Sequence, residues 1–458
     1  MRGLLKMRFD IKLPEEVETI INLLNKYGYE AYVVGGCVRD SILGRTPNDW
    51  DICTSALPDK VIEIFSDYEV IPTGLKHGTV TIVVDRMPFE VTTFRIDGDY
   101  SDNRRPDTVE FTTDIVKDLS RRDFTINAMA YNPKSGLIDP FDGVEDIKSK
   151  VIRCVGDAKE RFTEDALRIL RAVRFSAQFD FNIDSSTDNA IEMLYKNLNN
   201  ISVERITSEL NKMIVCPSFY RQMLCREFLF TLIIPELKEC VSYNQHNPYH
   251  AYDLYMHIAL AVGFGNRDIV TELALLLHDI GKPQCQTFDE RGIAHYYEHA
   301  KISADLADKR LKALKYDNDT RKKVVELISY HDATFNDEPK HIKKWLNKIG
   351  EEQFRRLLAV RYADIFAQNA MSMSQRLAYI DRIQERLNEV LASEQCFKLK
   401  DLAVNGNDLM EIGIPQGREI GNTLNWMLDM VINGEIENKK DELLNLARIK
   451  NKEKSDNV

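Results

Sequence analysis

Two kinds of hydrophobic pattern divide the chain. The first third mixes short runs of apolar, β-branched residues with helical stretches, whereas the remaining two thirds carry nearly continuous helical periodicity. Residues 15–28 predict an amphipathic helix that ends at Gly28, and residues 30–34 predict a buried strand that runs directly into Gly35 and Gly36. The pattern therefore predicts an α+β fold, with a head of mixed sheet and helices followed by an all-helical body.

Further elements follow from the same patterns. A helix is expected over 37–44, ending at Gly44, and another near 123–130. From residue 157 onward helices dominate, and Thr163 is the expected N-cap of a helix that continues to Phe179. Strands are expected at 50–53, 79–84, 89–94 and 108–112.

The composition is that of an ordinary globular chain. Of 458 residues, 44% are hydrophobic and 29% are charged, which excludes a disordered or fibrous protein. No stretch approaches roughly 18 uncharged apolar residues and the N-terminus lacks a secretion signal, so we expect no membrane span and a cytoplasmic location. The eight cysteines include no CxxC pair, which argues against a zinc ribbon or a disulfide framework and favours buried, reduced thiols.

The charge balance is acidic. A net charge of −11, from 61 basic and 72 acidic side chains, by itself argues against a nucleic-acid partner. The arginines gather locally, however, in pairs at 104–105 and 121–122 and at three-residue steps from 168 to 174. Because net charge averages over the whole chain, such clusters can still contact phosphates.

The first candidate site lies where the strand at 30–34 ends. Gly35 and Gly36 let a backbone approach phosphates closely, and Arg39 can add positive charge on the same side. Asp49 and Asp51 are two residues apart, so in an extended segment both project to one face while Trp50 points into the core. Paired carboxylates suit Mg²⁺, and the combination predicts a phosphoryl or nucleotidyl transfer site.

The order of motifs resembles that of the class II tRNA nucleotidyltransferase and bacterial poly(A) polymerase family, which belongs to the polymerase-β-like nucleotidyltransferases. The resemblance covers roughly residues 27–180. It rests on the segments YVVGGCVRDSILGRTPNDWDICTSALPD, EVTTFR, RRDFTINAMAYNP, GLIDPFDGVEDI and EDALRILRAVRF, which follow in the family's order.

This resemblance assigns roles to residues of the head. It implies that Asp49 and Asp51 hold catalytic Mg²⁺ and that Gly35, Gly36 and Arg39 hold the triphosphate. Glu90 is where a third carboxylate would lie, the alternative being an ordinary exposed strand residue. The contacts to ribose and triphosphate fall on Arg122, Asp123 and Asn127, with Asp123 either a helix N-cap or an orienting partner.

Base selection is expected at Asp165 and Arg168. Three apart on a helix, they share a face and present an acceptor beside donors. Cytosine and adenine both offer an amine beside an unprotonated ring nitrogen, so this pair accepts CTP and ATP and rejects UTP and GTP. The family resemblance implies the same contacts. Arg171 and Arg174 extend the basic stripe toward triphosphate or primer phosphates.

Histidines mark a second candidate site. Eight of the nine fall between residues 246 and 341, and His278 and Asp279 close an apolar helix. The pattern resembles the HD phosphohydrolase domain over about 250–370, which implies a site for one or two divalent metals such as Mg, Mn or Ni. A degenerate domain with a structural role is the alternative. The implied ligands are His257, His278, Asp279 and Asp364, with His299 and His331 as additional candidates.

Together the resemblances predict a tRNA nucleotidyltransferase that adds CCA to tRNA 3′ ends from CTP and ATP without a template. Residues 95–106 are expected to form a mobile loop between two strands. The family resemblance implies that such a loop is present in enzymes that add the terminal adenosine, which favours complete CCA addition or A addition. Alternatives are an A-adding enzyme, a poly(A) polymerase, or a working HD hydrolase with a non-catalytic RNA-binding head. No oligomeric state is indicated. The expected domains are the head (1–142), a base-recognition neck (143–240), the HD domain (241–370) and a tRNA-binding tail (371–458).

Overall fold

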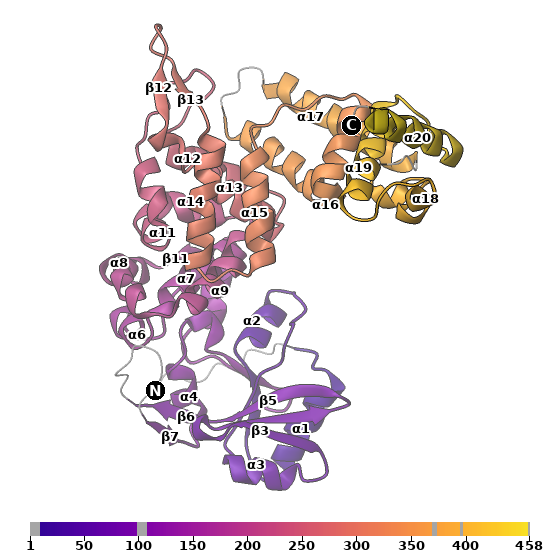
Figure 1. The fold of residues 1–458 in the computed structure, drawn as a ribbon. Coiled ribbons are helices and arrows are strands. Elements are labelled where there is room, and N and C mark those ends of the chain that lie inside the picture. Colours follow the sequence, from indigo (N-terminus) through magenta and orange to yellow (C-terminus); the bar gives the residue numbers. More distant parts are fainter. Residues whose placement is uncertain (1–9, 99–107, 369–372, 394–396, 457–458) are drawn as a thin grey trace. The chain divides into compact units, whose positions relative to one another are not determined.

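The computed structural model describes residues 10–98, 108–368, 373–393 and 397–456. The chain divides into two compact units, one ending at Ile233 and one beginning at Ile234. The first contains a mixed sheet with helices, and the described part of the second is helical apart from one short hairpin (Figure 1). This confirms the predicted fold class, while the division into four domains stays a prediction.

A seven-stranded mixed sheet forms the centre of the first unit. Its order is β3-β4-β5-β2-β1-β8-β9, and every neighbouring pair is antiparallel except β2 and β5, which are parallel. All four residues of β1 are buried, as the apolar run predicted. The strands are β1 (Ala31–Val34), β2 (Ile52–Thr54), β3 (Glu69–Gly74), β4 (Thr79–Val84), β5 (Met87–Thr93), β8 (Ala130–Asn132) and β9 (Gly136–Ile138).

The strand predicted at 108–112 lies outside this sheet. It is β7 (Val109–Phe111), which pairs only with β6 (Arg95–Asp97) among the described strands. The loop expected at 95–106 begins later than predicted, because residues 95–97 form β6. Residues 99–107, which include Arg104 and Arg105, lie outside the described residues. The helices around the sheet are α1 (Glu15–Lys26), α2 (Gly36–Ile42), α3 (Pro58–Ile64), α4 (Ile115–Ser120) and α5 (Gly143–Lys148), and η1 is a 3-10 turn (Leu75–His77).

The helix predicted near residues 123–130 is wrong. Only a 3-10 turn, η2 (Thr125–Asn127), forms there, and the chain continues as β8, whose Ala130 pairs with Val34 of β1. Every residue from 123 to 132 is buried. A segment buried on all sides has no polar face from which periodicity could distinguish a strand from a helix.

A break at Asp165 separates α6 (Ala158–Glu164) from α7 (Leu167–Phe179). Thr163 as an N-cap is therefore wrong: it lies in the last turn of α6, and its hydroxyl donates to the carbonyl oxygen of Lys159 (2.7 Å). The extended backbone of Asp165 (φ −141°, ψ 103°) interrupts a pattern that looked continuous in the sequence. The unit is completed by β10 (Val151–Ile152), β11 (Asn182–Ile183), α8 (Ser185–Leu194), η3 (Tyr195–Asn200), α9 (Val203–Ile214), α10 (Phe219–Cys225) and α11 (Glu227–Ile233).

Helices surround the buried α13 in the second unit, where all residues from Val270 to Leu277 are buried. Strands β12 (Gln286–Phe288) and β13 (Ala294–Tyr296) form an antiparallel hairpin that projects from the helices (Figure 1). The elements here are η4 (Pro235–Cys240), α12 (Leu254–Gly263), α13 (Ile269–Leu277), η5 (Lys282–Gln284), α14 (His299–Ala313), α15 (Asn318–Tyr330) and α16 (Pro339–Phe366), which is kinked at Gly350.

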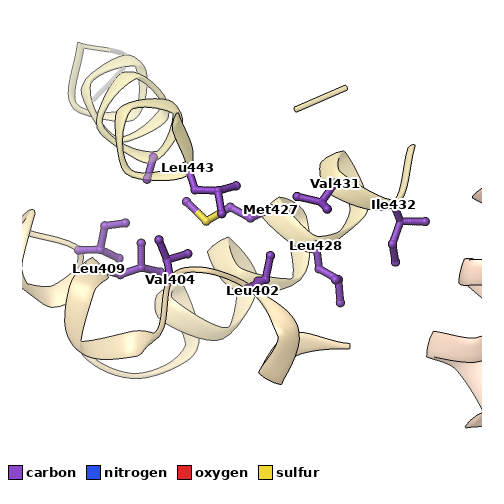
Figure 2. Packing of buried hydrophobic residues seen from close by; sticks show 10 residues of the cluster. Leu402, Val404, Leu409, Met427, Leu428, Val431, Ile432 and Leu443 are labelled. Carbon is purple, nitrogen blue, oxygen red and sulfur yellow. The ribbon is translucent and has the colours of Figure 1, made fainter. Parts of the chain in front are cut away.

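The C-terminal helices have a hydrophobic core of their own. Leu409, Met427 and Leu443 come from three different helices and point toward one another (Figure 2). These elements are α17 (Met373–Ala392), η6 (Leu399–Asp401), α18 (Gly406–Glu411), α19 (Arg418–Asn433) and α20 (Lys440–Asp456).

Two predictions from composition can be compared with the structure. None of the described helices is long and apolar enough to cross a membrane. The cysteines within the described residues are free thiols, but Cys225 is exposed and Cys285 is half-buried rather than buried.

Candidate functional site

The three carboxylates predicted from the sequence share a cavity of about 670 Å³. Asp49 and Asp51 immediately precede β2, and the parallel register of Ile52 with Val91 places Asp51 beside Glu90 of β5. Burial raises the pKa of Asp51, the negative charges of Asp49 and Glu90 raise it further, and Arg122 opposes them. Carboxylates that repel one another in this way favour a bound cation.

Trp50 does not point into the core, contrary to expectation. It is half-buried and lines the same cavity as its two aspartate neighbours. The reason is that β2 begins only at Ile52 rather than at residue 50, so the strict alternation of a strand does not apply to residues 49–51.

A glycine turn lies next to these carboxylates. The N–H of Val34 donates to the carbonyl oxygen of Asp51 (3.0 Å), which ties the end of β1 to the aspartates. Gly35 follows with φ +81°, and a Cβ there would lie 3.0 Å from Nη1 of Arg122. The positive φ favours glycine here, and a Cβ would in addition make the Arg122 guanidinium shift by a few tenths of an ångström.

Polar residues from three segments form one network behind the turn, and all of them are buried except the partly exposed Arg171. Arg39 Nη1 donates to Asn127 Oδ1 (2.5 Å), Asn127 Nδ2 donates to Asp123 Oδ1 (3.1 Å), and Arg171 Nε donates to Asp123 Oδ2 (2.7 Å). Burial by itself raises the pKa of Asp123, but Arg171 and Asn127 hold it at about 2. Of the two roles left open for Asp123, its bonds to Asn127 and Arg171 favour the orienting partner, because Phe124 rather than Asp123 is the N-cap of η2.

One carboxylate behind this network, that of Asp118, was not predicted from the sequence. Asp118 is fully buried, accepts from Arg121 Nη2 (2.8 Å) and lies 3.5 Å from Arg122 Nη2. It also accepts the N–H of Arg95 at the start of β6. In the sequence Asp118 looks like an ordinary helix residue, and its i,i+4 spacing to Arg122 was the available signal.

Asp165 and Arg168 do not share a helix face as expected, because Asp165 lies in the break before α7 and Arg168 lies in α7. The two residues stay adjacent, since the N–H of Arg168 donates to the backbone carbonyl oxygen of Asp165 (3.0 Å). Arg168 Nη1 instead donates to Glu164 Oε2 (2.6 Å). Asp165 accepts the N–H of Leu167 on Oδ1 (3.0 Å) and Nη2 of Arg205 on Oδ2 (2.7 Å). No sequence signal indicated Arg205, which lies forty residues further along the chain.

The two remaining arginines of α7 are also paired. Arg171 bonds Asp123, and Arg174 Nε donates to the buried Glu209 (2.6 Å). Both guanidiniums lie near the ring of Phe175, at 5.4 and 4.0 Å from its centroid. Their contact with phosphates stays a prediction.

The second unit brings together all six residues of the other predicted site. They come from α12 (His257), the end of α13 (His278, Asp279), the start of α14 (His299), the end of α15 (His331) and α16 (Asp364). Each histidine directs Nδ1 at a backbone carbonyl oxygen, 2.7–3.2 Å away, so each Nε2 faces the cluster. Histidines held in this way are typical of metal ligands.

Asp279 connects two halves of this cluster. Its Oδ2 lies 3.2 Å from Nε2 of both His257 and His278, while its Oδ1 lies 3.5 Å from Nε2 of His299 and 3.6 Å from that of His331. Among the residues that the structure describes, none forms a hydrogen bond with Oδ1, although this atom is buried. The donor set therefore fits one or two divalent cations of the kind that bind imidazole and carboxylate.

A cavity of about 370 Å³ opens onto the cluster. Lys282 lines it and places Nζ 2.6 Å from Asp279 Oδ2, a contact that sequence reasoning missed although the two residues are only three apart. Burial lowers the pKa of His278, but Asp279 and Asp364 together raise it to about 10. The negative field at this site therefore stabilises positive charge.

Comparisons with known protein families match three segments. Residues 31–153 match the family described as the Poly A polymerase head domain, residues 180–241 the probable RNA and SrmB- binding site of polymerase A, and residues 287–447 the putative tRNA nucleotidyltransferase domain 2.

Several CCA-adding enzymes are similar to this chain over nearly its whole length. The CCA-adding enzyme of Geobacillus thermodenitrificans is 35% identical over 93% of this chain and 94% of its own length. That of Lactobacillus helveticus is 33% identical over 94% and 97%. A solved structure, the CCA-adding enzyme of Bacillus stearothermophilus in complex with CTP, aligns with a TM-score of 0.68 and 31% identity over 97% of this chain and 99% of that one. The Thermotoga maritima CCA-adding enzyme complexed with tRNA, at 20% identity and a TM-score of 0.58 over 97% of each chain, shares the fold.

Proposed function

This chain belongs to the CCA-adding enzyme family, and we propose that the cavity of Asp49, Asp51 and Glu90 is its nucleotidyl-transfer site. The enzyme adds C, C and then A to the 3′ end of tRNA, using CTP and ATP. In each addition the terminal 3′ hydroxyl attacks the α-phosphate, a new phosphodiester bond forms and pyrophosphate leaves. The observation that supports this site is that three carboxylates line one cavity next to the glycine turn.

The three carboxylates are the residues that would hold Mg²⁺. They offer hard oxygen ligands on one side of a cavity open to substrate, which suits an ion that keeps waters and substrate phosphates in its shell. Bound Mg²⁺ would supply charge neutralisation at the reacting phosphate. The position of Glu90 in the parallel register supports its role as third ligand over that of an ordinary strand residue.

Arg122 is the residue best placed to meet the triphosphate. It lies against Gly35, where the absence of a side chain leaves its Nη1 accessible to the turn, and its charge reaches Asp51. Arg39 and Asn127 hold the turn from behind through their mutual hydrogen bond. Their direct contacts with ribose or phosphate remain part of this proposal.

Base selection rests on Asp165, which lies in the break before α7, and on Arg168, which lies in the first turn of α7. Asp165 is oriented by Leu167 and Arg205, and Arg168 by Glu164. A base entering beside them meets an acceptor and donors, which match the edges of cytosine and adenine. Rejection of uracil and guanine follows because a mismatch leaves these partly buried polar groups unpaired.

Product sequencing tests this function. Transcripts of tRNA ending at the discriminator base, after the first C or after the second C are offered with each nucleoside triphosphate separately. We expect C, C and A in turn from the wild type and no incorporation by Asp49→Ala. Addition of A alone would indicate an A-adding enzyme, and a long A tail would indicate a poly(A) polymerase.

A second candidate function is metal-dependent phosphohydrolysis at the histidine cluster of the second unit. The convergence of four Nε2 atoms and two carboxylates supports it. The six residues would hold Mg, Mn, Ni or a similar cation, which would supply Lewis-acid activation of water and of a phosphoryl oxygen. Phosphoesters at damaged RNA ends, such as cyclic phosphates, are the substrates we expect.

Separation of the two activities tests this candidate. Hydrolysis of bis(p-nitrophenyl) phosphate and of a nucleoside 2′,3′-cyclic phosphate is measured with each metal. His278→Ala should lose hydrolysis and keep CCA addition. Asp49→Ala should lose CCA addition and keep hydrolysis. Hydrolysis with no nucleotide incorporation by the wild type would support the alternative of a non-catalytic RNA-binding head. Because tRNA is the substrate, we also infer a cytoplasmic location.

A further inference from the structure

We propose that Tyr297 binds the base of the 3′-terminal nucleotide of a single-stranded RNA. Tyr297 is stacked on His295 at the rim of the cavity that opens onto the histidine cluster, which we call the second cavity. The phosphate of that nucleotide would then lie toward the histidine cluster. The inference rests on the phosphohydrolase function proposed above, which it extends by naming the group that recognises the substrate.

The two rings form a flat platform that is open to solvent. Their centroids are 5.7 Å apart and their planes differ by 10°. Tyr297 is 69% exposed, a large fraction for an aromatic side chain. Among the described residues, His295 is the ring that contacts it. Exposed aromatic faces of this kind are how proteins hold unpaired bases, because every base has a π-face.

The platform is anchored at the edge of the second cavity rather than on a loose loop. His295 belongs to β13, where it pairs with Thr287 of β12, and its Nε2 lies 3.4 Å from Asp289 Oδ2. The adjacent Tyr296 donates its hydroxyl to the carbonyl oxygen of Gln245 (2.6 Å). A base stacking on Tyr297 therefore meets a preorganised surface, so little conformational entropy is lost on binding.

The same cavity connects this platform with the chemistry of the cluster. Tyr297 and His295 line it together with Asp279, His299 and Lys282. Its volume of about 370 Å³ falls within the range of small-ligand sites. The aromatic rings suit a base and the buried ammonium of Lys282 suits a phosphate, so the cavity offers both ends of a nucleotide a complementary surface.

The positive charge of Lys282 and the exposed ring of Tyr297 favour a nucleotide over a ligand that has no base. A phosphate alone would need only the cation end of the cavity, and would leave the exposed face of Tyr297 without a function. The chain also acts on RNA 3′ ends at its other site, so such ends are present wherever the protein works.

Fluorescence titration of the full-length protein tests the platform without relying on hydrolysis. The probe is a short oligoribonucleotide ending in 2-aminopurine, whose fluorescence is quenched on stacking. We expect quenching with the wild type and with Tyr297→Trp, and about a tenfold weaker dissociation constant with Tyr297→Ala. Phe288→Ala is the matched control, because Phe288 is an exposed aromatic of the same hairpin that does not line the cavity.

Hydrolysis provides the second measurement. Oligoribonucleotides carrying a 2′,3′-cyclic phosphate are compared with and without the terminal base. Wild type should have a lower KM for the substrate with the base, and Tyr297→Ala should lose that preference with kcat retained. Equal affinity of wild type and Tyr297→Ala for the probe would overturn the proposal. Loss of quenching in Tyr297→Ala without hydrolysis by any variant would support the platform and refute the phosphohydrolase function instead.

Discussion

Removal of the Arg205 side chain should weaken the discrimination between bases. Its Nη2 donates to Asp165 Oδ2 at 2.7 Å and is the side-chain partner that orients this carboxylate. A hydrogen bond between charged groups contributes about 1.5–3 kcal/mol. Since the two side chains keep 23% and 15% of their exposure, we take the lower value, about 1.5 kcal/mol. That is about a tenfold change in a ratio of rates.

The assay is single-turnover incorporation of each labelled nucleoside triphosphate into tRNA lacking CCA. In Arg205→Ala, kcat/KM for CTP and ATP should fall relative to that for UTP and GTP by about tenfold. Arg221→Ala is the matched control, because its pair with Asp180 is exposed and should contribute little. If Arg205→Ala keeps wild-type selectivity while Arg168→Ala loses it, the proposed orientation of Asp165 is incorrect.

Four further predictions follow from the described contacts. The pKa of Asp123 is lowered to about 2 in the folded state, so its ion pair stabilises the protein above about pH 4 and loses this effect as the pH falls toward 2. Urea unfolding should give a free energy of unfolding about 2 kcal/mol lower for Asp123→Asn than for the wild type at pH 7, and this difference should shrink between pH 4 and pH 2. Gly35→Ala should cost about 1–3 kcal/mol and reduce nucleotide incorporation at least tenfold, and unchanged incorporation would contradict the glycine turn. Leu409→Ala should destabilise the C-terminal helices by about 2–5 kcal/mol, measured by hydrogen exchange, with the first unit unaffected. Added Mn²⁺ or Ni²⁺ should raise the thermal midpoint of the wild type more than that of His278→Ala, in which the carboxylates of the head remain, and an equal rise in both would argue against the cluster as the metal site.

The local elements of the candidate sites were predictable because each is a short pattern. A strand running into Gly35 and aspartates at 49 and 51 can be identified from adjacent residues, as can a His-Asp pair closing an apolar helix. The helix predicted at 123–130 was wrong for the opposite reason. Its residues are buried on every side, so no alternation of polar and apolar positions revealed that the chain turns into β8.

The sequence by itself determined which residue types were available for nucleotide transfer and for metal binding. Only the tertiary structure decided their partners. The parallel register of β2 and β5 places Glu90 beside Asp51. The break at Asp165 allows the carboxylate of Asp165 to accept a hydrogen bond from Arg205. Packing of the helices in the second unit places Asp279 between two groups of histidines. The physical reason is that backbone periodicity sets which residues share a face of one element, whereas buried charges pair with whatever packing brings within a few ångströms.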